Sequence, residues 1–138
     1  MRPIITFTTF WNANKVISML PNNNFRVHSI ALSNPALDKL PNLKDMSRLD
    51  IFCPSWEILN KYKQDKNWED YTKSFMELMH TRNKEVKEWL NSLSHGYRYF
   101  LCCWENTSKG SNCHRRLLYD AFKNSKLKDK YHFLYYHV

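Results

Sequence analysis

Residues 97–122, with the sequence YRYFLCCWENTSKGSNCHRRLLYDAF, form the stretch in which we expect the chemistry of this chain. Residues 97–104 are an aromatic and apolar run, which is typical of a buried strand. Residues 106–112 are polar, and CHRR at 113–116 opens a helical pattern. The first N–H groups of a helix have no partner inside the helix, and the helix dipole favours negative charge beside them. A strand, a polar loop and a helix in this order therefore predict a site that holds an anion.

Two more strands are predicted in the N-terminal part of the chain. Residues 3–10 (PIITFTTF) and 25–32 (FRVHSIAL) are rich in β-branched and aromatic side chains. Residues 15–20 between them have apolar side chains at helical spacing, with Asn12 or Asn14 as the expected cap. A strand, a helix and a strand in succession predict a parallel pair of strands with a right-handed crossover.

The segment 33–52 is predicted to be a long irregular connection, because it contains two prolines and few periodic apolar residues. Connections of this length are often lids or binding loops. Arg48 lies near its end and is either an anion ligand or a solvated surface arginine. His28, in the preceding strand, is expected to be structural rather than catalytic.

The middle of the chain is predicted to be helical. CPSWE at 53–57 resembles a helix start, with Ser55 or Cys53 as the cap and proline in the first turn. Apolar residues then recur at helical spacing from Trp68 and again from Val86, and their aromatic side chains are expected to lie in the core. After a basic segment, residues 131–138 form a last strand-like run.

Length and composition agree with one folded domain. The 138 residues suffice for one hydrophobic core, and 43% hydrophobic with 15% aromatic content is too rich for a disordered chain. We therefore expect residues 1–138 to form a single three-layer α/β domain, with a short, mostly parallel sheet and a helical middle segment. The net charge of +8 favours an anionic partner, either a nucleotide or a nucleic acid.

The sequence also predicts where the protein works. The N-terminus, MRPIITFTTFW, has no charged region followed by an uninterrupted apolar segment, so no signal peptide is expected. No run approaches the roughly 20 apolar residues that span a bilayer, so no membrane partner is expected. These features predict a cytoplasmic protein whose cysteines are reduced.

Cys102 and Cys103 alternate across a strand and therefore cannot serve one site together.

Five residues around the predicted loop are candidates for chemistry. Cys103 and Glu105 are two residues apart and face the same side at the end of the strand. Cys113 lies at the helix N-terminus, where the dipole lowers the pKa of a thiol. His114 and Arg115 fall in the first helical turn, and the planar fork of arginine suits phosphate or carboxylate.

Three interpretations of this group remain open. In the first, Cys103 or Cys113 is a nucleophile, with His114 or Glu105 as the acid or base. In the second, Cys103, Glu105, Cys113 and His114 bind a metal such as zinc. However, C-x₉-C-H is not a standard zinc spacing, and adjacent Cys-His seldom ligate one ion. In the third, the group is structural, with a pair between Glu105 and Arg115. With two glycines the chain has neither a Walker loop nor a dinucleotide fingerprint, and we expect no cofactor.

The first functional hypothesis is binding, with turnover as an extension, of a nucleotide or other phosphate-bearing ligand. Arg115 and the helix N-terminus would hold the anion, with Arg48 as a further ligand, while Thr8 and Thr9 at the end of the first strand would face the same pocket. The alternative is a small basic interaction protein that binds nucleic acid or a host protein through residues 123–130. The sequence does not indicate an oligomeric state.

Several motifs resemble one known family. Cys103-Trp104-Glu105 followed by Cys113-His114-Arg115 is similar to the C-[aromatic]-E…C-H-R signature of the domain-of-unknown-function 488 family. TTFWN at 8–12, VHSIA at 27–31 and FCPSWEILNKYK at 52–63 resemble further segments of that family in the same order. The resemblance implies a small cytoplasmic α/β domain of bacterial or phage type, without an established activity. Here the loop 106–112 is longer and more polar than is usual in the family.

Overall fold

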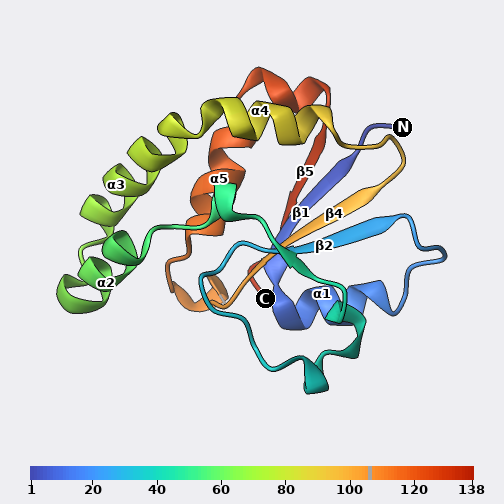
Figure 1. Cartoon of the computed structure of the whole chain (residues 1–138), viewed down its shortest axis with the longest axis horizontal. Helices are drawn as coiled ribbons and strands as arrows, with labels where there is room; N and C mark the ends of the chain where they lie inside the picture. The colour runs from blue at the N-terminus through green and yellow to red at the C-terminus, as the bar shows by residue number, and fades with distance from the viewer. Residues whose placement is uncertain (106) are drawn as a thin grey trace.

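The computed structural model describes residues 1–105 and 107–138, so Asn106 of the predicted polar loop lies outside the described residues. In this part of the chain, five parallel strands form one sheet in the order β3-β2-β4-β1-β5 (Figure 1). The strands are β1 (Ile4–Thr9), β2 (Phe25–Ser29), β3 (Ser47–Arg48), β4 (Arg98–Cys103) and β5 (His132–Tyr135). The helices are α1 (Phe10–Ile17), α2 (Trp56–Asp65), α3 (Trp68–Thr81), α4 (Asn83–Asn91) and α5 (His114–Lys123). The predicted α/β class is confirmed.

The central strand of the sheet is β4, not one of the two strands that come first in the chain. β4 pairs with β1 through Thr9↔Cys103 and with β2 through Ser29↔Cys102. The predicted pairing of the first two strands with each other is therefore wrong, although both are parallel and α1 joins them. β4 is buried along almost its whole length, and this apolar character suits the middle of a parallel sheet.

Helices cover both faces of the sheet, which gives the three predicted layers (Figure 1). In β1 and in β4, five consecutive residues are buried, and consecutive side chains of a strand point to opposite faces. The α1 crossover runs from β1 toward the β3 edge, whereas the α5 crossover runs from β4 toward the β5 edge. Right-handed crossovers in opposite directions place α1 on one face and α5 on the other.

The first helix begins earlier than its apolar pattern predicts. α1 starts at Phe10, directly after β1, because the Thr9 hydroxyl accepts a hydrogen bond from the N–H of Asn12 at 3.1 Å. The expected caps at Asn12 and Asn14 are therefore wrong. Phe10, Ala13 and Ile17 form the buried face of this helix.

The helical middle segment is confirmed, and it extends beyond the sheet. Ser55 caps α2 by accepting from the N–H of Ile58 at 3.1 Å. α2 and α3 pack against each other and reach away from the strands, and α3 also contacts α4 and α5 (Figure 1). The connection 33–52 contains short 3₁₀ turns and the two-residue strand β3. No helix in the described residues is long and apolar enough to cross a membrane.

Candidate functional site

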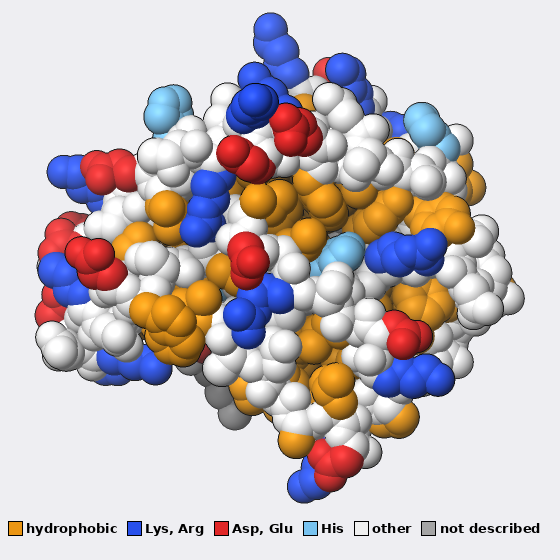
Figure 2. Space-filling view, viewed as in Figure 1, with side chains coloured by type: hydrophobic (Ala, Val, Ile, Leu, Met, Phe, Trp, Pro, Cys, Tyr) orange, Lys and Arg blue, Asp and Glu red, His pale blue; other side chains and the backbone are white. Residues whose placement is uncertain are grey.

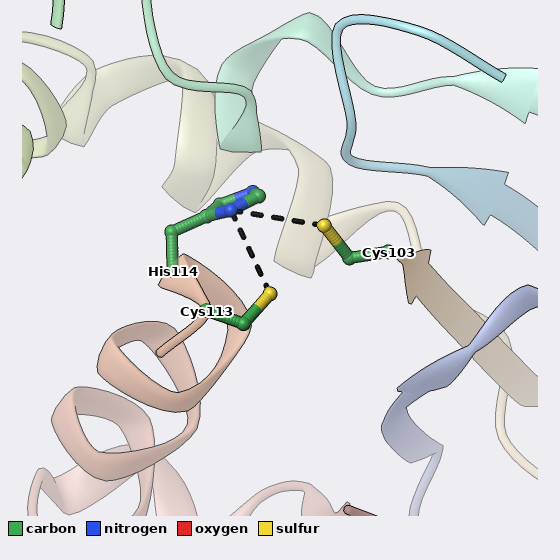
Figure 3. Close-up of side chains that lie close together, drawn as sticks. All are labelled: Cys103, Cys113 and His114. Atoms are coloured by element: carbon green, nitrogen blue, oxygen red, sulfur yellow. Dashed lines mark hydrogen bonds between the residues drawn. The ribbon is translucent and has the colours of Figure 1, made fainter. Parts of the chain in front are cut away.

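Three side chains meet where the central strand ends and the last helix begins. Cys103 is the final residue of β4, Cys113 is the N-cap of α5, and His114 is the first residue of that helix. The Nδ1 atom of His114 lies 3.9 Å from Sγ of Cys103 and 4.0 Å from Sγ of Cys113 (Figure 3). All three residues are buried. The structure thus brings together three of the four residues predicted to be catalytic.

The backbone at the start of α5 explains how two adjacent residues face one point. Cys113 has an extended conformation, with φ −146° and ψ 139°, and His114 is already helical. This change of backbone direction turns both side chains toward the end of β4 (Figure 3). Adjacent Cys and His residues seldom ligate one ion, but here the side chains of Cys113 and His114 face the same point.

His114 is held in a single orientation by groups far away in the sequence. Its Nε2 lies 2.7 Å from the carbonyl oxygen of Ile30, the residue after β2. A carbonyl only accepts, so Nε2 carries the hydrogen and Nδ1 is the atom that faces the sulfurs. The ring of Phe75, on α3, packs edge-on against the imidazole at 5.2 Å.

Glu105, the fourth predicted catalytic residue, lies beside this group. Its Oε2 atom is 3.7 Å from Sγ of Cys103, while the rest of the residue is exposed at the surface. Burial of the carboxyl group, together with the negative charge of the nearby Cys113, raises the pKa of Glu105. Glu105 therefore adds a carboxylate with an elevated pKa to two sulfurs and an imidazole.

The two thiols are not equivalent. Burial opposes ionisation of Cys113, but hydrogen bonds with Cys103 and His114 and the charges of His114 and Arg115 outweigh it and hold the pKa of this thiol well below its usual range. The hydrogen bond to Cys113, followed by burial, raises the pKa of Cys103 well above its usual range. Of the two thiols, Cys113 is therefore the one that the surroundings favour as a thiolate.

A pocket of about 70 Å³, open to solvent, lies over this cluster. Its floor includes the four polar residues Cys103, Glu105, Cys113 and His114. Its walls include aromatic side chains from three elements, which are Tyr62, Trp68, Tyr71 and Trp104. The mixture of aromatic walls with a few polar groups is typical of sites for small ligands.

The remaining predicted ligand residues do not line this pocket. Arg115 is fully buried, and its Nη2 donates to the carbonyl oxygens of Tyr136 and His137 at 3.2 and 2.9 Å. The Thr8 hydroxyl donates to the carbonyl oxygen of Val138 at 3.2 Å, so it also meets the C-terminal segment. The anion-binding role predicted for these residues stays a prediction.

Two other predicted ligand residues have structural partners. Thr9 is buried and caps α1. Arg48 is exposed, and its Nη2 donates at 3.1 Å to the carbonyl oxygen of Leu32, which lines the pocket. Of the four residues predicted to bind the ligand, Arg48 is therefore the one that lies beside the rim of the pocket.

Sequence reasoning missed the aromatic wall and the Ile30 carbonyl. Trp68 and Tyr71 stack with ring centroids 4.7 Å apart, and Tyr62 packs edge-on against both. Helical spacing assigned Tyr62 to the apolar face of one helix and Trp68 and Tyr71 to that of the next, but it does not distinguish a core face from a pocket wall. A backbone carbonyl leaves no sequence signal at all.

A comparison with protein-family models identifies the family of this chain. Residues 41–126 match the family model described as "Active DUF488-N3 subclade". The chain belongs to the DUF488 family. The match includes all four floor residues of the pocket, which agrees with the resemblance of the C-x-E…C-H-R motif. No curated protein and no solved structure gives a significant match to the chain.

Proposed function

We propose that this DUF488 protein binds a nucleotide or a related phosphate-bearing small molecule in the pocket and acts on it at the floor. The observation that carries this proposal is the combination of aromatic walls with the cluster of Cys103, Glu105, Cys113 and His114 in one pocket. Flat rings stack on aromatic side chains, and such stacking contributes about 1–3 kcal/mol per base. The word "active" in the description of the matched subclade supports turnover as well as binding.

The charges of the pocket favour one orientation of the ligand. The Cys113 thiolate and the Glu105 carboxyl group make the floor a poor place for a phosphate. Arg48 lies beside the rim, and an arginine has five N–H donors, of which its contact with Leu32 uses one. We therefore place the ring between the aromatic walls and the phosphate at the rim, near Arg48.

Thermal unfolding with a set of nucleotides and the matching nucleosides tests this proposal. A bound nucleotide raises the melting temperature of the protein, because the ligand binds the folded state. Arg48→Ala removes most of the shift for nucleotides and keeps the smaller shift for nucleosides. Arg26→Ala is the matched control, since Arg26 is an exposed arginine in the first half of β2, away from the pocket.

Two results would contradict the proposal. One is a melting temperature that no nucleotide raises. The other is an equal loss of the nucleotide shift in Arg26→Ala and Arg48→Ala, because this would indicate a general effect of net charge.

Binding of nucleic acid or a host protein through residues 123–130 is the second candidate. Lys126 and Lys128 lie in the 3₁₀ turn before β5, and the carbonyl of Lys128 accepts from Arg2 at 3.0 Å. This turn lies at the end of the sheet where the strands begin, whereas the pocket lies at the opposite end, where the strands finish. On the face shown in Figure 2, Lys and Arg side chains are interspersed with Asp and Glu rather than gathered.

The two candidate surfaces can therefore be separated by mutation. Steeply salt-dependent binding of DNA or RNA that persists in Cys113→Ala, and that is lost when the lysines of 123–130 become glutamine, would favour the second candidate. Nucleic-acid binding that is unchanged in the lysine variant would remove it.

A further inference from the structure

We propose that Cys103, Cys113 and His114 bind one zinc ion through the two sulfur atoms and Nδ1, and that the fourth coordination position opens into the pocket. The metal assignment follows from the geometry of these three residues. It rests on the proposed function only for the ligand on which the ion would act.

The donor atoms have the identity and spacing that zinc requires. Thiolates and imidazole nitrogens are the preferred ligands of zinc, with Zn–S about 2.3 Å and Zn–N about 2.0 Å, so that sulfur and nitrogen atoms of a tetrahedral site lie about 3.6 Å apart. The two S–N separations here are 3.9 and 4.0 Å. All three donor atoms lie within 4.8 Å of one another, so side-chain shifts of a few tenths of an ångström close the site.

The contacts around His114 match those of a metal-bound histidine. A histidine that binds a metal usually donates its other ring N–H to a carbonyl or carboxylate, which fixes the ring and the tautomer. His114 does so through Nε2, at 2.7 Å from the carbonyl oxygen of Ile30, and Phe75 packs against the ring. Nδ1 is thereby aimed at the two sulfurs before any ion arrives (Figure 3).

A metal ion also explains why so many ionisable groups are buried together. Two cysteines and a histidine meet below a carboxyl group, and all four line the same pocket. Two thiolates neutralise the charge of Zn²⁺, so the three ligands and the ion together would carry no net charge. Buried charges are tolerated when they are paired or coordinate a metal.

The number of protein ligands indicates a catalytic rather than a structural site. Structural zinc sites have four protein ligands, whereas catalytic sites have three and keep one position for water. Glu105, with Oε2 3.7 Å from Sγ of Cys103, lines the pocket next to these ligands. Zinc lowers the pKa of bound water to about 7. Zinc held there would activate water, and Glu105 would be the nearby group able to accept its proton.

Titration of the full chain with zinc alone tests the proposal. The protein is purified under reducing conditions, stripped with a chelator, dialysed against zinc and analysed by mass spectrometry of the metal. We expect one zinc per chain, and loss of this stoichiometric binding in Cys103→Ser, Cys113→Ser and His114→Gln. Cobalt in place of zinc gives thiolate-to-metal charge-transfer absorption, which weakens with each cysteine removed.

Cys102→Ala is the matched control, because Cys102 is buried and adjacent to Cys103 but faces the other side of the strand. Cys102→Ala should keep one zinc per chain. If Cys102→Ala does not fold, Cys53→Ala is the control instead. If the ligand variants unfold, the cobalt spectrum of the unchanged protein decides. A folded, reduced protein that binds no zinc would overturn the proposal. Equal zinc binding by the Cys103→Ser/Cys113→Ser double variant would also overturn it.

The two proposals fail independently. Zinc binding is measured without any nucleotide, and the nucleotide shift in melting temperature is also measured on the chelator-stripped protein. Loss of the zinc proposal therefore leaves the pocket as a ligand site, and loss of the nucleotide proposal leaves the metal site.

Discussion

His114 donates its Nε2–H to the carbonyl oxygen of Ile30 at 2.7 Å, which joins two residues that are 84 positions apart. Ile30 is in turn fixed to the sheet, because its N–H donates to the carbonyl oxygen of Cys102 at 3.0 Å. The imidazole is therefore positioned by the sheet and not only by its own helix. The precise placement of Nδ1 beside two sulfurs depends on this contact.

Loss of this contact should destabilise the protein even without metal or ligand. His114→Phe leaves the Ile30 carbonyl without a donor inside the protein, at a cost of about 1–3 kcal/mol in the free energy of unfolding. Urea denaturation in chelator-containing buffer measures this effect. His80→Phe, at an exposed position on α3, is the control and should change stability by less than about 0.5 kcal/mol. Equal stability of the two variants would contradict the role given to the Ile30 contact.

Acid should weaken the fold through His28. Burial, with a smaller contribution from the charge of Arg26, lowers the pKa of His28 from 6.5 to about 4. Between pH 6.5 and pH 4, His28 is protonated in the unfolded chain but not in the folded protein. The contribution of neutral His28 to the free energy of unfolding is therefore fully present above pH 6.5 and is lost as the pH falls toward 4. We expect a loss of about 2–3 kcal/mol from this residue.

His28→Gln provides the comparison for that measurement. The variant lacks this titration, so its free energy of unfolding should fall less than that of the unchanged protein between pH 7 and pH 4. Denaturant unfolding at several pH values measures both proteins. Parallel curves over this range would refute the assignment to His28.

Arg115 should hold the C-terminal segment in place. Its Nη2 donates to the carbonyls of Tyr136 and His137, and its guanidinium group lies 5.3 Å from the ring centroid of Tyr135. Arg115→Met removes both hydrogen bonds while filling a similar volume. Residues 136–138 should then exchange their amide hydrogens at least about 10-fold faster, as expected for a loss of roughly 1.4 kcal/mol of local protection.

The control for this effect is Arg26→Met, since Arg26 is an exposed arginine on β2, a strand that does not pair with β1 or β5. Exchange of the C-terminal amides should be unchanged in this variant. Acceleration of equal size in both variants would show that the segment is held by general charge rather than by Arg115.

The cap of α2 should contribute a measurable share of stability. The Ser55 hydroxyl accepts from the N–H of Ile58 at 3.1 Å, and loss of such a cap costs about 1 kcal/mol. Ser55→Ala should lower the free energy of unfolding by about this amount, and Ser55→Thr should restore most of it. Guanidinium denaturation measures all three proteins, and failure of threonine to rescue would point to a cause other than the cap.

The fold class was predictable from the sequence because most elements carry strong local signals. The apolar run ending at Cys103 and the helical patterns from Trp68 and Val86 each match an observed element. The start of α1 was misplaced because the capping residue, Thr9, also belongs to a strand-like run. Periodicity locates the apolar face of a helix, whereas a cap is set by one hydrogen bond.

Strand order and pocket walls were not predictable in the same way. Pairing of β4 between β1 and β2 is a long-range choice that no local pattern records. The floor residues Cys103 and Cys113 were correctly expected near one another, because both flank one loop. Arg115 was expected at the same pocket, but its position in the first helical turn directs it to the C-terminal segment instead.

The central position of β4 has a consequence for how the chain is made. β1 and β2 are synthesised first, and each has one edge whose partner is β4. Until residues 98–103 leave the ribosome, the nascent chain carries two strands that cannot complete their hydrogen bonding with each other. The sheet therefore closes late, through contacts distant in sequence, which is characteristic of slow folding. A fragment ending before residue 98 lacks both neighbours of β1 and one neighbour of β2, so it should expose three aggregation-prone strand edges, whatever the stability of the finished protein.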